Sequence, residues 1–225
     1  MKQHLLLAFA TLAIHLSAMA IEEPTYKVLV TEDSFEVRQY APMLVAETLV
    51  DGDMDEASRK GFKKIADFIF GNNSAAKTGS SAKIAMTAPV TVEPQSEKIA
   101  MTAPVTVTPT AKDASMNDSS KWRVQFVMPS KYSLANIPQP NNSEVKLREI
   151  PGKFFAVNRY SGFNNQSHVQ SKTDELLAWM QRKNFKTLGS PQLSRYDPPW
   201  TLPMFRRNEI MVEVEDIQAP LKKSP

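Results

Sequence analysis

The side chains best able to do chemistry are few in this sequence. Its 225 residues contain no cysteine and three histidines, His4, His15 and His168. The lack of cysteine excludes disulfides, thiolate metal sites and cysteine nucleophiles together. Only seven glycines are present, and none has the Gly-x-Gly-x-x-Gly or P-loop spacing that holds phosphates. Thiol chemistry and nucleotide binding are therefore not expected.

The first residues have the pattern of an export signal. Lys2 precedes an apolar run at residues 5–16, and the small residues of Ser-Ala-Met-Ala at 17–20 occupy the positions that a signal peptidase recognises. The run holds about 12 residues, well short of the roughly 20 that span a bilayer. We expect residues 1–20 to be a signal peptide cleaved after Ala20, no membrane span, and a periplasmic or secreted mature protein.

Cleavage would leave His168 as the single histidine. A structural zinc site then lacks ligands, and no metal site is expected. A Ser-His-Asp triad would have to use this one imidazole, and no Gly-x-Ser-x-Gly elbow accompanies it. A hydrolase would require His168 to lie beside a serine and a carboxylate. We therefore expect no catalytic residues and no enzymatic activity.

The charge pattern argues against nucleic acid as a partner. The formal net charge is +3, and the basic residues occur as scattered pairs, such as Lys63-Lys64 and Arg206-Arg207, with no run of five or six. The expected mature chain is long enough for one domain with a substantial core. We expect a single domain over residues 21–215, a flexible tail at 216–225, and a monomer.

Two prolines reveal an internal repeat. Pro42 and Pro151 are 109 residues apart, and each separates two strand-like segments that lead through a polar gap into a helical pattern. The helices are predicted at about 56–70 and 166–183. The chain thus consists of two strand-turn-strand-helix halves.

The helices have clear boundaries and apolar stripes. Asp53 and Glu56 have the spacing of an N-cap and its partner, and Gly71 is placed as a left-handed C-cap. Spacing at i, i+3, i+4 and i+7 predicts one buried face on each helix. The stripes are Phe62, Ile65, Ala66 and Ile69 in the first helix, and Val169, Leu176, Leu177 and Met180 in the second.

Strands outnumber helices. Alternating apolar residues predict strands at 122–128 and 210–214, and another is expected at 26–30. Segments 72–81, 108–120 and 138–143 have the composition of exposed loops. The predicted class is α+β, with an antiparallel sheet curled toward a barrel and two flanking helices.

The chain resembles the SOUL haem-binding family over residues 26–214. The resemblance rests on five segments in order: MDEASR at 54–59, KIAMTAPV at 98–105, WRVQFVMP at 122–129, the strand at 156–162, and YDPPW at 196–200 followed by RRNE at 206–209. Membership implies a twisted antiparallel barrel with two helices and internal pseudo-twofold symmetry. It also implies binding of haem or related tetrapyrroles, without known catalysis in most members. The architecture is similar to effector-binding domains that recognise large, flat cationic drugs.

The resemblance directs attention to the first helix. Arg59 matches a family position implicated in ligand contact, and its helical spacing brings Phe62, Lys63 and Ala66 near the same side. Haem needs an apolar wall with cations at one rim, which this set would supply. The alternative is that Phe62 and Ala66 are core residues while Arg59 and Lys63 form a solvated flank.

Three residues qualify this resemblance. Asp67 stands where some members have a second basic residue, and Val45 stands near the histidine that ligates iron in one branch. Valine cannot coordinate iron, and we expect His168, at the start of the second helix, to be a surface or capping residue rather than a ligand. Any haem would then bind through apolar contacts with weak or no axial coordination.

The C-terminal motif allows two interpretations. Residues 196–200 could cover the groove, with Arg206 and Arg207 as cations at its rim. Alternatively Trp200 and the prolines fix a loop against the barrel, and Arg207 pairs with Glu209; we favour this second interpretation.

The decapeptide KIAMTAPVTV occurs twice, at 83–92 and 98–107. Family members need one such segment, so we expect the second copy to occupy the family strand and the first to pair beside it, with either copy dispensable. The predicted function is non-catalytic binding of haem or related tetrapyrroles in an apolar groove, for sequestration or transport. The alternative is a binding module for another apolar ligand or an envelope protein partner.

Overall fold

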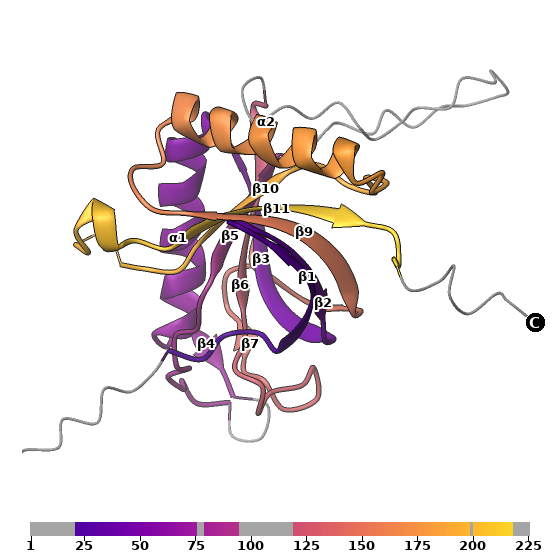
Figure 1. Ribbon diagram of the computed structural model, residues 1–225. Coiled ribbons are helices and arrows are strands. Elements are labelled where there is room, and N and C mark those ends of the chain that lie inside the picture. The colour runs from indigo at the N-terminus through magenta and orange to yellow at the C-terminus, as the bar shows by residue number, and fades with distance from the viewer. Residues whose placement is uncertain (1–20, 76–78, 95–118, 199, 218–225) are drawn as a thin grey trace, which may run out of the picture.

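The computed structural model describes residues 21–75, 79–94, 119–198 and 200–217, and within them a nine-stranded antiparallel sheet curls into a half-barrel beside two helices (Figure 1). The predicted α+β class is confirmed. The strands of the sheet are β1 (Tyr26–Glu32), β2 (Phe35–Tyr40), β3 (Met43–Asp51), β5 (Val90–Pro94), β6 (Lys121–Val127), β8 (Lys146–Ile150), β9 (Lys153–Tyr160), β10 (Gln192–Arg195) and β11 (Asn208–Val214). The helices are α1 (Met54–Ile69) and α2 (Gln166–Arg182), with a short 3-10 turn η1 (Pro203–Phe205).

The strand order displays the internal repeat. The sheet runs β1-β2-β9-β11-β10-β5-β6-β3-β8, so β5 and β10 are neighbours at its centre. Moving outward from this pair, β6, β3 and β8 on one side correspond to β11, β9 and β2 on the other. Pro42 separates β2 from β3 and Pro151 separates β8 from β9, which confirms the predicted pseudo-twofold relation.

Helix α1 begins and ends where its sequence predicts. The Asp53 carboxylate accepts a hydrogen bond from the backbone N–H of Glu56 at 2.8 Å, and Gly71 follows the helix with φ of +126°. Ile65, Ala66 and Ile69 are buried, whereas Phe62 is 39% exposed. A Cβ at Gly61 would lie 2.5 Å from Val124 Cγ2, so glycine lets α1 approach β6 closely.

Helix α2 packs against the other half of the sheet. Asn165 caps it by accepting a hydrogen bond from the backbone N–H of His168 at 2.9 Å. Val169, Leu176 and Met180 are buried as predicted, but Leu177 is 37% exposed, because Thr173 and Trp179 complete the buried face instead.

The faces of the sheet differ in chemistry. Side chains of alternate residues point toward the helices and form the main core, which includes Val37, Trp122, Val124 and Phe126. The opposite, inner face carries a smaller apolar cluster of Tyr40, Val157 and Met211 together with many charged groups.

Two predictions about local structure are corrected. Segments 72–81 and 138–143 are not loops throughout, since β4 (Asn73–Ser74) pairs with β7 (Gln139–Pro140). The prediction that the second decapeptide occupies the family strand is wrong. Strand β5, from the first copy, pairs with β6 on one edge and β10 on the other. Both of its edges are occupied, and residues 98–107 lie outside the described part of the chain.

Candidate functional site

The four residues predicted from α1 lie along one flank of the helix, but they do not contribute equally. Arg59 and Lys63 are exposed, and Phe62 presents its partly exposed ring beside that of Phe126, with 5.4 Å between the ring centroids. Ala66 is only 7% exposed and belongs to the core. The α1 flank therefore offers one supported aromatic ring with two exposed cations on the same side of the helix.

The two residues that depart from the family are placed in different surroundings. Asp67 is exposed on α1, where its carboxylate accepts a hydrogen bond from the Asn72 amide. Val45 lies on β3 opposite Val127 and is 1% exposed. Val45 takes no part in the surface formed by Arg59 and Phe62, but the exposed Asp67 lies one helical turn beyond Lys63 and places a negative charge there.

The inner face of the sheet holds a buried ionic cluster that sequence reasoning missed. Arg38 donates two hydrogen bonds to the Glu209 carboxylate, at 2.8 and 3.1 Å, and both side chains are at most 1% exposed. Glu209 also accepts a hydrogen bond from the Tyr196 hydroxyl at 2.6 Å and another from Arg207 Nε at 3.0 Å. The alternation of Arg38 and Tyr40 along β2 indicated a shared face, but no sequence signal connected them to Glu209.

Electrostatics fix the charges in this cluster. Burial opposes ionisation of Glu209, but hydrogen bonds from Arg38 and Tyr196 and the nearby arginine charges outweigh it, so the pKa of Glu209 is lowered. Burial raises the pKa of Tyr40 to about 12. The guanidinium groups of Arg38 and Arg207 also lie over the Tyr26 and Tyr196 rings, 4.5 and 3.7 Å from the centroids. A cationic ligand would need acidic and aromatic groups around it. On this face Arg38 and Arg207 already occupy the surroundings formed by Glu209, Tyr26 and Tyr196.

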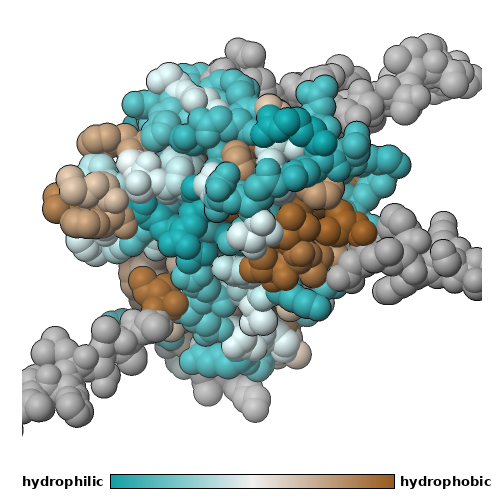
Figure 2. Space-filling view, viewed as in Figure 1, coloured by the Kyte–Doolittle hydropathy of each residue, from teal (hydrophilic) through white to brown (hydrophobic). Residues whose placement is uncertain are grey.

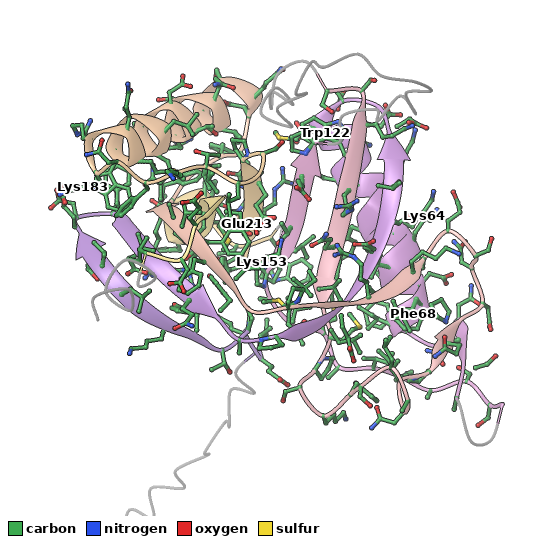
Figure 3. The ribbon with its side chains drawn as sticks, turned by 90° about the vertical axis from the view of Figure 1, so that its right-hand side faces the viewer. Lys64, Phe68, Trp122, Lys153, Lys183 and Glu213 are labelled. Carbon is green, nitrogen blue, oxygen red and sulfur yellow. The ribbon has the colours of Figure 1, made fainter. Side chains whose placement is uncertain are left out.

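A second charged group extends along the same face. Lys153 and Glu213 lie together between the walls of the curled sheet, with 2.5 Å between Nζ and Oε2 (Figure 3). Glu47 pairs with Arg148, and Arg123 lies 3.5 Å from Glu93. Burial raises the pKa of Glu93, against the opposing influence of Arg123, Lys153 and Arg148. Opposite charges balance here, so this face has no excess charge for an anionic ligand.

The favoured interpretation of the C-terminal motif is confirmed in one part and wrong in the other. The predicted pair forms, since Arg207 Nε lies 3.0 Å from Glu209 Oε1. Trp200, however, is 82% exposed and does not fix the loop against the barrel. The prediction that it packs is wrong, because the loop is held instead by backbone contacts such as the 2.9 Å hydrogen bond from Gly162 N to Pro203 O.

Exposed apolar side chains gather where this loop meets the loop between β9 and α2. We call this surface the apolar tip, and Figure 2 shows it as brown and tan atoms at the projecting turn η1. Each of its large side chains is more than half exposed: Phe163, Trp200, Leu202, Met204 and Phe205. Such a contiguous patch is unusual for a surface that faces only water.

Arg195 lies between the apolar tip and the α1 flank. Its guanidinium reaches Asp55 of α1 at 3.5 Å and interacts electrostatically with Tyr160 and Arg206 near the tip. Its Nε atom is buried without a hydrogen-bond partner in the described structure. Burial lowers the pKa of Arg195 despite the attraction of Asp55. The cation is therefore incompletely compensated.

His168 lies at the edge of the apolar tip. Its ring is partly exposed, in agreement with the predicted surface position, but the residue that caps α2 is Asn165, which accepts the hydrogen bond from the His168 backbone N–H. The ring nitrogen Nδ1 lies 2.8 Å from the carbonyl oxygen of Phe163. Within the described chain neither ring nitrogen has a serine or carboxylate partner, so triad geometry is not present there.

A cavity of about 420 Å³ lies at another edge of the sheet. It is formed by the segment at 22–25, the turn between β2 and β3, and the end of β6, and its lining includes Pro24, Met43, Met128 and Tyr132. The residues that the structure describes include no helix able to cross a membrane, and no group of three or more histidine or acidic side chains suited to a metal ion.

Solved structures share this fold at low sequence identity. The C-terminal domain of EcmrR matches with a TM-score of 0.56 and 12% identity, covering 85% of this chain and 99% of that one. A protein from Listeria innocua named as a hydrolase matches with a TM-score of 0.51 and 13% identity, over 83% and 94% of the two chains. No curated protein sequence matches the chain. At these identities the likeness concerns the fold alone.

The sequence matches a family model described as "SOUL heme-binding protein" over residues 21–97 and 93–213. The two ranges overlap between the decapeptide copies, so each range contains one copy. Together they cover most of the chain, which therefore belongs to the SOUL haem-binding family. This is a family of binding proteins, and haem binding is the role that membership supports.

Proposed function

We propose that this protein binds haem or a related tetrapyrrole on the α1 flank, without catalysing a reaction, in order to sequester or transport it. The observation that carries the proposal is the exposed Phe62 ring, which is supported by Phe126, with the exposed cations Arg59 and Lys63 near the same side of α1. An aromatic face suits the macrocycle, and the cations suit its propionates. The incompletely compensated Arg195 beside Asp55 adds a further cation near the same flank.

The proposed setting follows from the sequence. The export signal supports a periplasmic or secreted protein cleaved after Ala20, and we propose that it acts as a monomer without a nucleic-acid partner. The α1 flank is open to solvent, because Arg59, Phe62 and Lys63 are exposed. Haem bound there could be exchanged with other carriers, which suits transport.

Titration of the purified mature protein with hemin tests the proposal. We expect saturable binding seen in the Soret band. Phe62→Ala should weaken binding about fivefold to tenfold through loss of apolar contact. Arg59→Ala should weaken it roughly twofold to fivefold, because exposed ion pairs contribute little.

Lys60→Ala is the matched control. Lys60 is also an exposed cation of α1, but it pairs with Glu56 and lies away from Phe62 along the helix surface, so its loss should leave affinity unchanged. Absence of saturable binding would refute the function. Unchanged affinity in both Phe62→Ala and Arg59→Ala would refute the site.

A second candidate is binding of a smaller apolar ligand in the cavity of about 420 Å³. Its volume suits a compact molecule, and its lining combines apolar side chains such as Met43 and Tyr132 with polar ones such as Glu22 and Thr25. Met43→Trp would fill this cavity, so it should abolish binding of such a ligand while leaving hemin affinity intact. A molecule extracted from the native protein would identify the occupant.

A further inference from the structure

The hydrogen bond of the His168 ring selects the neutral tautomer that can bind a metal through Nε2. A carbonyl oxygen only accepts hydrogen bonds, so Nδ1, which lies 2.8 Å from the Phe163 carbonyl oxygen, carries the proton in the neutral ring. The lone pair is then on Nε2. A metal-ligating histidine commonly donates its other N–H to a backbone carbonyl in this way, which fixes both tautomer and ring orientation.

The surroundings fix the imidazole further. Its ring meets the Tyr160 ring edge-on at a centroid distance of 5.3 Å. A Cβ at Gly162 would lie 3.3 Å from His168 Cε1, so glycine leaves room for the ring against the backbone. Nε2 has no partner among the residues that the structure describes, and it is not among the buried polar atoms left without one. The atom is therefore not fully buried.

The surface next to this nitrogen suits a flat apolar molecule with an acidic edge. Phe163, which accepts the hydrogen bond from His168, belongs to the apolar tip together with Met204 and Phe205. Arg206 lies over the Phe163 ring at 6.0 Å from its centroid. Arg195 is close enough to both Tyr160 and Arg206 to interact with them electrostatically, so two cations lie near the imidazole.

We propose that His168 Nε2 is an axial ligand of haem iron, with the macrocycle against the apolar tip and its propionates toward Arg195 and Arg206. This proposal rests on the haem-binding part of the proposed function and names an iron ligand, but it places the macrocycle at the apolar tip, on the other side of Arg195 from Phe62. It therefore expects His168→Phe, and not Phe62→Ala, to lower the affinity for ferric haem. It replaces the expectation of weak or no axial coordination, which considered His168 only as a helix-start residue. The sequence could not reveal that the Phe163 carbonyl holds Nδ1 and leaves Nε2 as the nitrogen with the lone pair.

The test compares ferric haem with iron-free protoporphyrin IX. His168→Phe keeps an aromatic ring beside Tyr160 but removes both nitrogens. We expect affinity for ferric haem to fall at least about tenfold, with a shifted Soret band and an altered electron paramagnetic resonance signal, because an iron–nitrogen bond is lost. Affinity for protoporphyrin IX should stay the same, since that ligand has no iron to coordinate.

Exogenous imidazole provides a readout that a merely structural role would not change. In His168→Ala, added imidazole should restore the spectrum of the unmodified protein. Lys183→Ala is the control, because it removes a charged side chain at the opposite end of α2, where Lys183 pairs with Glu32, and it should leave the spectrum unchanged.

The outcomes separate the two proposals. If ferric haem binds with the same affinity and spectrum in His168→Phe and in His168→Ala, the axial-ligand proposal is overturned and haem binding stands. If neither haem nor protoporphyrin IX binds the unmodified protein, both are overturned. Circular dichroism melting of each variant confirms that the compared proteins are folded.

Discussion

At the level of single residues, the strongest constraint is the ionic cluster around Glu209. Arg38 and Glu209 are 171 residues apart in sequence, yet they form a two-point ion pair that is almost fully buried. Removing one member of such a pair leaves an uncompensated charge in the interior, which costs far more than the pair itself contributes.

Glu209→Gln should lower the free energy of unfolding by about 2–4 kcal/mol at neutral pH, because Arg38 and Arg207 lose their shared buried carboxylate and keep only Glu36 and Glu23 as acidic partners. Urea denaturation measures the change. Glu56→Gln, which disrupts an exposed pair with Lys60 on α1, should cost no more than about 0.5 kcal/mol. A loss below about 1 kcal/mol in Glu209→Gln would show that Tyr196 and the arginines tolerate a neutral partner.

Glu93 should give the protein a distinctive pH dependence. Because burial raises its pKa in the folded state, the folded protein holds more protons than the unfolded chain just above the ordinary value of 4.5. The contribution of Glu93 to stability then falls as pH rises through that window. Glu93→Gln should remove this decline, which denaturation at a series of pH values from 4 to about 8 would measure. An identical pH profile in the variant would contradict the prediction.

At the level of elements, sequence signals located both helices because the signals are local. Asp53, Asn165 and Gly71 act within one helical turn of the residues they cap, and their roles follow from backbone chemistry alone. The exposure of Phe62 and Leu177 could not be predicted in this way. Both satisfy the apolar spacing, and only the positions of β6 and of the remaining core decide which stripe residues are covered.

Gly61 tests how closely α1 approaches the sheet. Alanine is the better helix former by about 1 kcal/mol, so propensity alone predicts that Gly61→Ala stabilises the protein. The 2.5 Å approach to Val124 predicts the opposite, a loss of roughly 1–3 kcal/mol from overpacking. Thermal melting decides between them. The double variant Gly61→Ala with Val124→Ala should show less loss than the two single changes added together, since truncating Val124 makes room.

The decapeptide offers a test at the level of a strand. Deleting residues 83–97 or residues 93–107 yields the same shorter sequence, in which KIAMTAPVTV is followed by Thr-Pro in place of Glu93-Pro94. Strand β5 then keeps Val90, Thr91, Val92 and a proline at their positions between β6 and β10. We expect a folded monomer with a melting temperature near that of the full protein, measured by circular dichroism and gel filtration.

Failure of the shortened chain to fold would show that the second copy has a structural role of its own. The sequence could not decide which copy forms β5, because identical residues have identical preferences for strand and turn. Which copy forms β5 depends instead on how the chain connects the elements, since β5 must follow α1 and pair with both β6 and β10.

For the whole molecule, the pseudo-twofold order of the sheet was predictable, whereas the chemistry of its inner face was not. The equivalent prolines and helices define the two halves from sequence alone. The contacts of Glu209, Glu93 and Lys153 join strands distant in sequence, so they depend on the register of the assembled sheet. The apolar tip also depends on the assembled fold, because the loop before α2 meets the loop after β10 there.

The exchange of outer strands between the halves has a further consequence. Strand β2 belongs to the first half in sequence but pairs with β9 of the second, while β8 of the second half pairs with β3 of the first. Each half of the sheet thus includes one outer strand that comes from the other half of the sequence. This is the arrangement of a strand-swapped dimer whose two subunits have been joined into one chain. On its own, neither half would therefore have a complete set of strand neighbours.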